Sequence, residues 1–113
     1  CSTYFFPRET YFCRNPDCDG RGFDDVPLSR RGRVWSWSTN HYAPPAPYVA
    51  SEPFQPYTIA AVELADERMV VLGQLAEGVD PTTLRVGAEV ELTLGTLFED
   101  DEHSYLMWKW SPV

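Results

Sequence analysis

Five short stretches of this chain alternate large apolar and smaller or polar side chains with a period of two, and they constrain its fold more than any other feature. They cover residues 34–42, 57–64, 69–76, 88–97 and 104–110. Period two together with β-branched and aromatic residues predicts β-strands. Helical periodicity is nearly absent, but Asp80 and Pro81 form an N-cap and a first-turn proline that predict one short helical turn. Five strands with this turn between the third and fourth predict an all-β, five-stranded OB-fold barrel.

Three details of the strand pattern give more specific expectations. In the first stretch, Val34, Ser36 and Ser38 should lie on one face, with Trp35 and Trp37 on the other. Gly73, inside the third stretch, predicts a bulge or a barrel corner. Residues 43–56 hold five of the ten prolines, a density that no hydrogen-bonded strand tolerates. We therefore expect a long loop there, and long loops in small domains are functional or disordered.

Charge divides the chain into two parts. The net charge is −8, yet residues 1–33 hold six basic and five acidic residues, whereas residues 34–113 hold three basic and twelve acidic ones. We interpret 1–33 as a zinc-ribbon-like segment with a connector, and 34–113 as the barrel. Phosphate backbones and anionic membranes are bound by Lys and Arg. The acidic barrel therefore predicts neither a nucleic-acid partner nor a membrane.

The chain begins with Cys1 and has no apolar run long enough to span a bilayer and no charged-then-apolar leader. Either an upstream part was removed or the chain is a piece of a larger polypeptide, and we expect the second. Three cysteines are an odd number, which fits a reducing compartment and a thiolate metal site better than a secreted disulfide framework. The sequence therefore predicts a cytoplasmic location.

The cysteines are the candidate metal ligands. Cys13 and Cys18 flank a turn at Pro16 and Asp17, and Cys1 lies eleven intervening residues before Cys13. Structural zinc takes four tetrahedral ligands, and three thiols are present. A cysteine upstream of Cys1 could complete the site, and the chain itself offers three other groups: Asp17, Asp19 and His41. The alternative is that the cysteines are simply buried free thiols.

Other chemistry-bearing groups give weaker signals. A nucleophilic cysteine needs a partner base. Neither His41 nor His103 occurs with a cysteine in a recognisable catalytic motif. The acidic run at 99–102 lacks the glycine and spaced oxygens of a calcium loop, so we interpret it as a solvated turn. The basic cluster of Arg30, Arg31 and Arg33 either contacts a phosphate of a nucleotide-like cofactor held by a partner or is a hydrated connector.

Core packing should account for half or more of the aromatic residues, and the remainder allows two interpretations. OB barrels can stack bases on aromatic platforms in a basic groove, which makes a single-stranded nucleic-acid-binding domain the alternative function. The acidic barrel speaks against it, and aromatic and proline-rich loops also anchor protein interfaces. We therefore predict partner contacts at five aromatic residues: Trp35, Trp37, Tyr42, Tyr48 and Phe54. A stand-alone enzyme, such as a thioesterase, is the third hypothesis.

Taken in order, the motifs resemble a known family. Gly32-Arg33-Val34-Trp35-Ser36-Trp37, His41-Tyr42-Ala43-Pro44-Pro45, Leu72-Gly73 and Leu84-Arg85-Val86-Gly87 are similar to segments of the acyl-CoA-associated OB-fold family, once catalogued only as a domain of unknown function. The resemblance covers essentially the whole chain. It implies a rubredoxin-like zinc ribbon followed by an OB barrel. The ribbon's first cysteine and the family's N-terminal helix have no counterpart in these residues.

The resemblance also implies a function. Family members are partners of thiolase-fold enzymes that act on coenzyme A thioesters, and some are tails of hydratase-like chains in bacterial steroid degradation that pair with a lipid-transfer-protein-type aldolase. We therefore expect a non-catalytic accessory domain that stabilises such an aldolase or thiolase in a hetero-oligomer, such as a heterotetramer, and helps to shape its acyl-CoA site. The thioester would bind mainly to the partner, near Arg30, Arg31 and Arg33.

Overall fold

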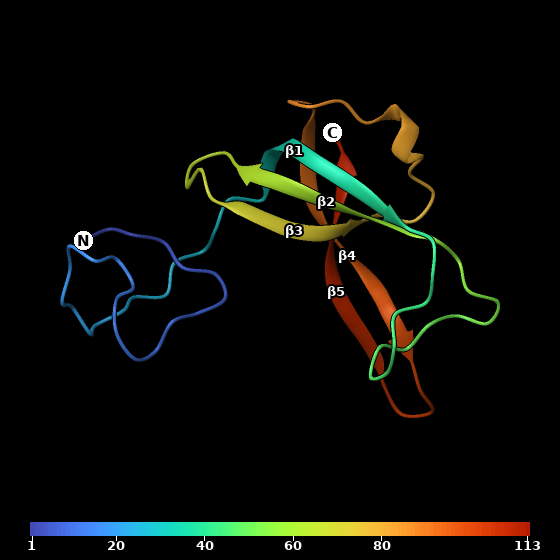
Figure 1. Cartoon of the computed structure of the whole chain (residues 1–113), viewed down its shortest axis with the longest axis horizontal. Coiled ribbons are helices and arrows are strands. Elements are labelled where there is room, and N and C mark those ends of the chain that lie inside the picture. Colours follow the sequence, from blue (N-terminus) through green and yellow to red (C-terminus); the bar gives the residue numbers. More distant parts are fainter.

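The computed structural model describes residues 1–113 and contains five strands and one short helical turn (Figure 1). The elements are β1 (Arg31–Asn40), β2 (Tyr57–Leu64), β3 (Val70–Leu75), the 3-10 turn η1 (Pro81–Thr83), β4 (Glu89–Glu99) and β5 (Ser104–Pro112). The strands close into a barrel in the order β1-β2-β3-β5-β4. The all-β, five-stranded barrel predicted from the sequence is therefore confirmed. No helix in the structure has the length and apolar character needed to cross a membrane.

The barrel closes through two short contacts. β3 and β5 run parallel and pair through only two residue pairs, and β1 pairs with β4 through three. Gly32 lies at the second closure, opposite both Leu64 and Val90. A Cβ at Gly32 would collide with the carbonyl oxygen of Glu63 and would lie 2.6 Å from a methyl carbon of Val62. Only glycine lets the three strands approach so closely.

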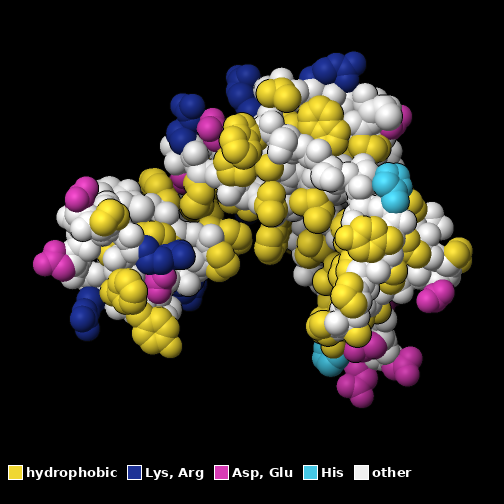
Figure 2. All heavy atoms as spheres, viewed as in Figure 1, with side chains coloured by type: hydrophobic (Ala, Val, Ile, Leu, Met, Phe, Trp, Pro, Cys, Tyr) yellow, Lys and Arg dark blue, Asp and Glu magenta, His cyan; other side chains and the backbone are white.

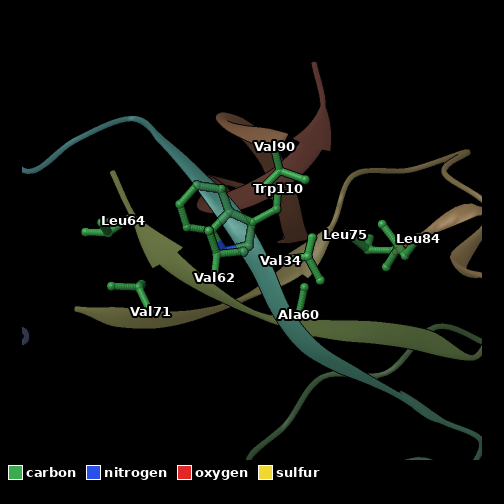
Figure 3. Close-up of a cluster of buried hydrophobic side chains, with 9 residues drawn as sticks. All are labelled: Val34, Ala60, Val62, Leu64, Val71, Leu75, Leu84, Val90 and Trp110. Carbon is green, nitrogen blue, oxygen red and sulfur yellow. The ribbon is translucent and has the colours of Figure 1, made fainter. Parts of the chain in front are cut away.

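The core is small and lies inside the barrel (Figure 3). Nine buried side chains form it, and they come from all five strands and from the residue after η1: Val34, Ala60, Val62, Leu64, Val71, Leu75, Leu84, Val90 and Trp110. Trp110 is its largest member and is only 1% exposed. Gly73 faces this indole without a register shift between β2 and β3, so the bulge expected there is absent. The glycine instead makes room for Trp108 and Trp110.

A bulge does occur in β1, and it corrects the predicted faces of that strand. The β1–β2 register shifts between Val34 and Ser36. One extra residue inverts the alternation that follows it. Val34 and Trp37 therefore both face the core, whereas Trp35 is 61% exposed. The expectation that Trp35 and Trp37 share a face was wrong.

The N-terminal residues form a separate lobe, drawn in blue in Figure 1, without strands or helices. Its connector is fixed to the β2–β3 turn, because the Ser29 N–H donates to Glu67 Oε2 at 2.9 Å and the Asp66 N–H donates to Ser29 Oγ at 3.3 Å. β1 begins at Arg31, so the first barrel strand starts three residues before the expected boundary at 33/34. The division into two domains at that boundary stays a prediction.

The paired ends of β4 and β5 extend beyond the barrel. β4 contacts β1 only through residues 89–91, and β5 contacts β3 only at Lys109 and Trp110. Between these points and the turn, residues 94–108 pair only with each other. We name this twisted ribbon, seen below the barrel in Figure 1, the β4–β5 arm.

Candidate functional site

The three cysteines converge in the N-terminal lobe. Their sulfur atoms all lie within 4.8 Å of one another, and the Sγ atoms of Cys1 and Cys13 are 3.5 Å apart. The sequence prediction that Cys1, Cys13 and Cys18 gather at one point agrees with this geometry. The other groups considered as ligands, namely Asp17, Asp19 and His41, do not join the cluster.

A tight turn presents the Cys18 thiol. The Cys18 N–H donates to the carbonyl of Asn15 and the Cys13 N–H donates to the carbonyl of Gly20, both at 3.0 Å. The Gly20 N–H in turn donates to Cys18 Sγ at 3.4 Å. This hydrogen bond, followed by one from the Cys13 thiol, lowers the pKa of Cys18. The turn therefore favours the thiolate, which is the form that binds metal.

The donor set fits zinc. A zinc–sulfur distance of about 2.3 Å in a tetrahedral site places neighbouring sulfur atoms about 3.8 Å apart, which is close to the spacing of the three thiols. The chemistry also agrees, since thiolates are preferred ligands of zinc. Three of four tetrahedral positions are supplied by Cys1, Cys13 and Cys18. Zinc there would cross-link a lobe that has few other internal bonds.

A cleft separates the lobe from the barrel, and its walls are largely apolar (Figure 2). Its volume is about 940 Å³. The lobe contributes Phe5, Phe6 and Phe23, and the barrel contributes Leu92 and Trp108. The two sides touch where the rings of Phe6 and Trp108 meet edge to face at 5.6 Å. A cleft of this size and lining suits an apolar group or an apolar protein segment.

The predicted partner-contact aromatics lie in different settings. Trp35 and Tyr42 are exposed, whereas Trp37 packs against the core. In the proline-rich loop, Tyr48 stacks on Tyr57 with ring centroids 5.7 Å apart, and Phe54 meets the same ring edge to face at 6.2 Å. Burial raises the pKa of Tyr48. The loop therefore has an aromatic anchor on β2, and its role in partner contact stays a prediction.

The predicted CoA-proximal arginines lie beside β4. Arg31 pairs with Glu91, and Arg33 pairs with Glu89, both at 3.6 Å across the β1–β4 contact. Arg30 lines the cleft. Two of the three thus have carboxylate neighbours within the chain, and the proximity of all three to coenzyme A stays a prediction.

The histidines do not join the cysteines. His103 lies in the turn of the β4–β5 arm beside Asp100 and Tyr105, and His41 follows β1 on the surface. The Asp100 carboxylate accepts the N–H groups of Glu102 and His103 and the Tyr105 hydroxyl. These bonds, in that order of effect, lower the pKa of Asp100. The acidic run thus forms the hairpin turn expected from the sequence.

One exposed apolar face was not among the predicted sites. Leu94, Leu106 and Trp108 lie on one face of the β4–β5 arm. The period-two pattern of both strands places these residues on the core face. The alternation of apolar residues was therefore visible in the sequence. Only the structure shows that the barrel closes before these residues, so that this face of the two strands is exposed to solvent.

The fold and the cysteine cluster define an OB-fold domain with a cysteine-rich N-terminal segment. The family model described as "ChsH2, C-terminal OB-fold domain" matches residues 25–95, and the chain belongs to this family. The resemblance inferred from the sequence is therefore confirmed.

Curated relatives extend this result. A DUF35 domain-containing scaffold protein of Pyrococcus furiosus is 32% identical over 100 residues, which cover 87% of this chain and 69% of the relative. Benzoylsuccinyl-CoA thiolase subunit BbsA of Thauera aromatica is 38% identical over 83 residues, which cover 73% of this chain and 51% of that protein. The chain thus spans about half to two thirds of these relatives. Among solved structures, a chain of the "Ltp2-ChsH2(DUF35) aldolase" matches with a TM-score of 0.71 at 28% identity, over 99% of this chain and 77% of that chain.

Proposed function

We propose that this chain is a non-catalytic accessory domain that binds and stabilises a thiolase-fold enzyme acting on coenzyme A thioesters. The observation that carries the proposal is the apolar cleft between lobe and barrel, continuous with an exposed apolar face, in a chain whose histidines and cysteines are apart. Such surfaces are rarely left open in a monomer. The names of the relatives, a scaffold protein, a thiolase subunit and a member of an aldolase complex, support this function.

The partner's chemistry would be that of an aldolase or a thiolase. One similar protein belongs to an aldolase and another is a thiolase subunit. The family resemblance suggests bacterial steroid side-chain degradation as the metabolic context. The partner would bind most of the thioester and supply all catalytic groups. The accessory domain would form part of the acyl-CoA entrance, with Arg30 facing the cleft and Trp35 and Tyr42 available for contact.

We further propose that zinc is a structural component of the lobe. Cys1, Cys13 and Cys18 would hold it as thiolates, with a fourth ligand from outside the cluster. When bound, zinc would supply a cross-link and no catalysis, because a closed four-ligand site leaves no position for water. The lobe wall of the cleft would then depend on the metal.

The test is co-expression with the thiolase-fold enzymes of the same organism. We expect one of them to co-elute with this chain in a fixed ratio, with a mass by light scattering that fits a hetero-oligomer such as a heterotetramer. Its yield and activity should fall when the chain is omitted or replaced by an acidic OB-fold domain of another family. If no such enzyme co-elutes, and each is equally soluble and active alone, the proposal is wrong.

A further inference from the structure

The β4–β5 arm is an unusual element for a small isolated domain. Its residues 94–108 pair only with each other, and a two-stranded ribbon is marginally stable by itself in water. Its far end is nevertheless ordered by two contacts. The rings of Phe98 and Tyr105 stack with centroids 4.5 Å apart, and the Tyr105 hydroxyl donates to Asp100 at 3.0 Å. The arm is thus an ordered element, although none of its side chains belongs to the nine-residue core of the barrel.

One face of the arm is apolar and open. Leu94 and Trp108 are directly opposite each other, and Leu106 is opposite Thr96 one step further along. This face is the same as that of Leu92 and Trp110 in the barrel, because residues two apart in a strand share a face. Leu94 is 66% exposed and Leu106 is 62% exposed. Figure 2 shows apolar side chains running down the arm on the side toward the cleft.

The base of this face is held in place. The Trp108 Nε1–H donates to the carbonyl of Leu72 at 2.8 Å, and Phe6 packs against the indole. Trp108 also lines the cleft. The arm face and the cleft therefore form one continuous apolar surface, framed by the N-terminal lobe on one side and the arm on the other.

The charges of the β4–β5 arm are of one sign, whereas the cleft is lined by both Arg8 and Arg30 and by acidic residues. The arm ends in four consecutive acidic residues, 99–102, and the only lysine of the chain, Lys109, is 93% buried beside Gly95. No arginine lies in the arm. An occupant that fits the arm would have an apolar contact area with Lys or Arg where it meets the acidic end.

We propose that the β4–β5 arm is the docking element of this chain, and that its Leu94, Leu106 and Trp108 face receives an apolar area bordered by basic side chains on the thiolase-fold partner. The inference rests on the function proposed above and adds where, and to what surface, the chain binds. A small ligand bound in the cleft would leave Leu94 and Leu106 exposed to solvent, because these residues lie outside the cleft. A second copy would bring together two barrels that each carry twelve acidic and three basic residues over 34–113.

The experiment uses the complex isolated by co-expression and compares three variants. Leu94→Thr with Leu106→Thr removes apolar contact and keeps a residue that favours strands. Val86→Thr is the matched control, since Val86 is an apolar residue outside the arm that is exposed at least as much as the two leucines. Asp101→Asn with Glu102→Gln removes tip charge without touching Asp100, which holds the turn. Circular dichroism and melting of each variant establish that the barrel is folded.

We expect the double threonine variant to raise the Kd for the partner by tenfold or more, as for central contacts of an interface, and Val86→Thr to leave it unchanged. The tip variant should slow association several-fold at low salt and weaken its salt dependence. In the wild-type complex, backbone amides of the arm should gain protection from hydrogen exchange.

Three results would overturn the inference. If the wild-type chain binds its partner and the threonine variant binds equally well, with no added protection of the arm, the arm is not the docking element although the proposed function stands. If the chain alone forms a dimer that the threonine variant abolishes, the face belongs to a second copy. If no thiolase-fold enzyme binds the wild-type chain, the proposed function fails and this inference fails with it.

Discussion

Replacing Gly73 with alanine tests the packing on which the junction of barrel and arm depends. A Cβ at this position would lie 2.8 Å from Trp110 Nε1 and 2.9 Å from two ring atoms of Trp108. Neither indole can move freely, since Trp110 is fully buried and Trp108 is hydrogen-bonded to Leu72. Overfilling a packed site costs about 1–3 kcal/mol. The lower entropy of the unfolded alanine chain offsets about 0.4–1 kcal/mol of this.

The net expectation is a loss of about 0–2.6 kcal/mol in the free energy of unfolding, with a central value of about 1.3 kcal/mol. Urea denaturation followed by tryptophan fluorescence measures it, as a lower midpoint with an unchanged slope. Gly22→Ala is the matched control, because no atom lies within 4 Å of its Cβ position and its φ is not positive, so it should leave the midpoint unchanged or slightly higher. In a double-mutant cycle, Trp108→Leu should restore part of the stability lost in Gly73→Ala.

The reasoning would be refuted by a Gly73→Ala protein that unfolds at the wild-type urea concentration with unchanged fluorescence. It would also be refuted if Trp108→Leu and Gly73→Ala were strictly additive. Either outcome would mean that the two indoles do not fill the space above Gly73.

Three further predictions concern the other parts of the molecule. Metal analysis of the wild-type protein should find about one zinc per chain, and Cys13→Ser should lose it together with the chelator-sensitive part of the melting transition; equal zinc content in both proteins would contradict the site. The Asp100 carboxyl should titrate by NMR below the ordinary aspartate pKa of about 4; because its folded pKa is depressed, its contribution to stability is present above that pH and is lost as the pH falls through the folded value, and an ordinary pKa would contradict the turn geometry. Trp37→Ala should destabilise the barrel by roughly 2–3 kcal/mol, whereas Trp35→Ala should change its stability by less than about 0.5 kcal/mol; equal losses in urea denaturation would mean that the β1 bulge is misplaced.

Local patterns sufficed for the elements of this fold. Alternation in the five stretches, the Asp80-Pro81 signal and the prolines of residues 43–56 predicted the strands, the helical turn and the loop, because each depends on neighbours close in sequence. The observed strands begin or end within a few residues of the predicted ranges. The spacing of Cys13 and Cys18 around a turn likewise indicated a metal-type cluster, which the sulfur positions agree with.

Two features could not be predicted from the sequence, the register of β1 and the role of Gly73, because both depend on contacts between strands that are distant in the chain. Nothing local distinguishes the bulged Trp35 from Trp37, because the register of β1 is fixed by the partners that it meets on β2. Gly73 predicted a bulge or a barrel corner, because a glycine in a strand can have several causes, and only the approach of Trp108 and Trp110 decides among them.

The chain by itself determined an acidic, all-β barrel and a cluster of thiols, since composition and short-range periodicity fix which residues prefer strands, turns and metal. The tertiary structure alone decided which apolar side chains become core. Leu92 and Leu94 belong to the same alternating run, yet Leu92 packs against the barrel core and Leu94 lies in solvent. The difference arises because β1 and β3 leave the sheet before β4 and β5 end, so the arm carries a core-type face past the point where the barrel can cover it.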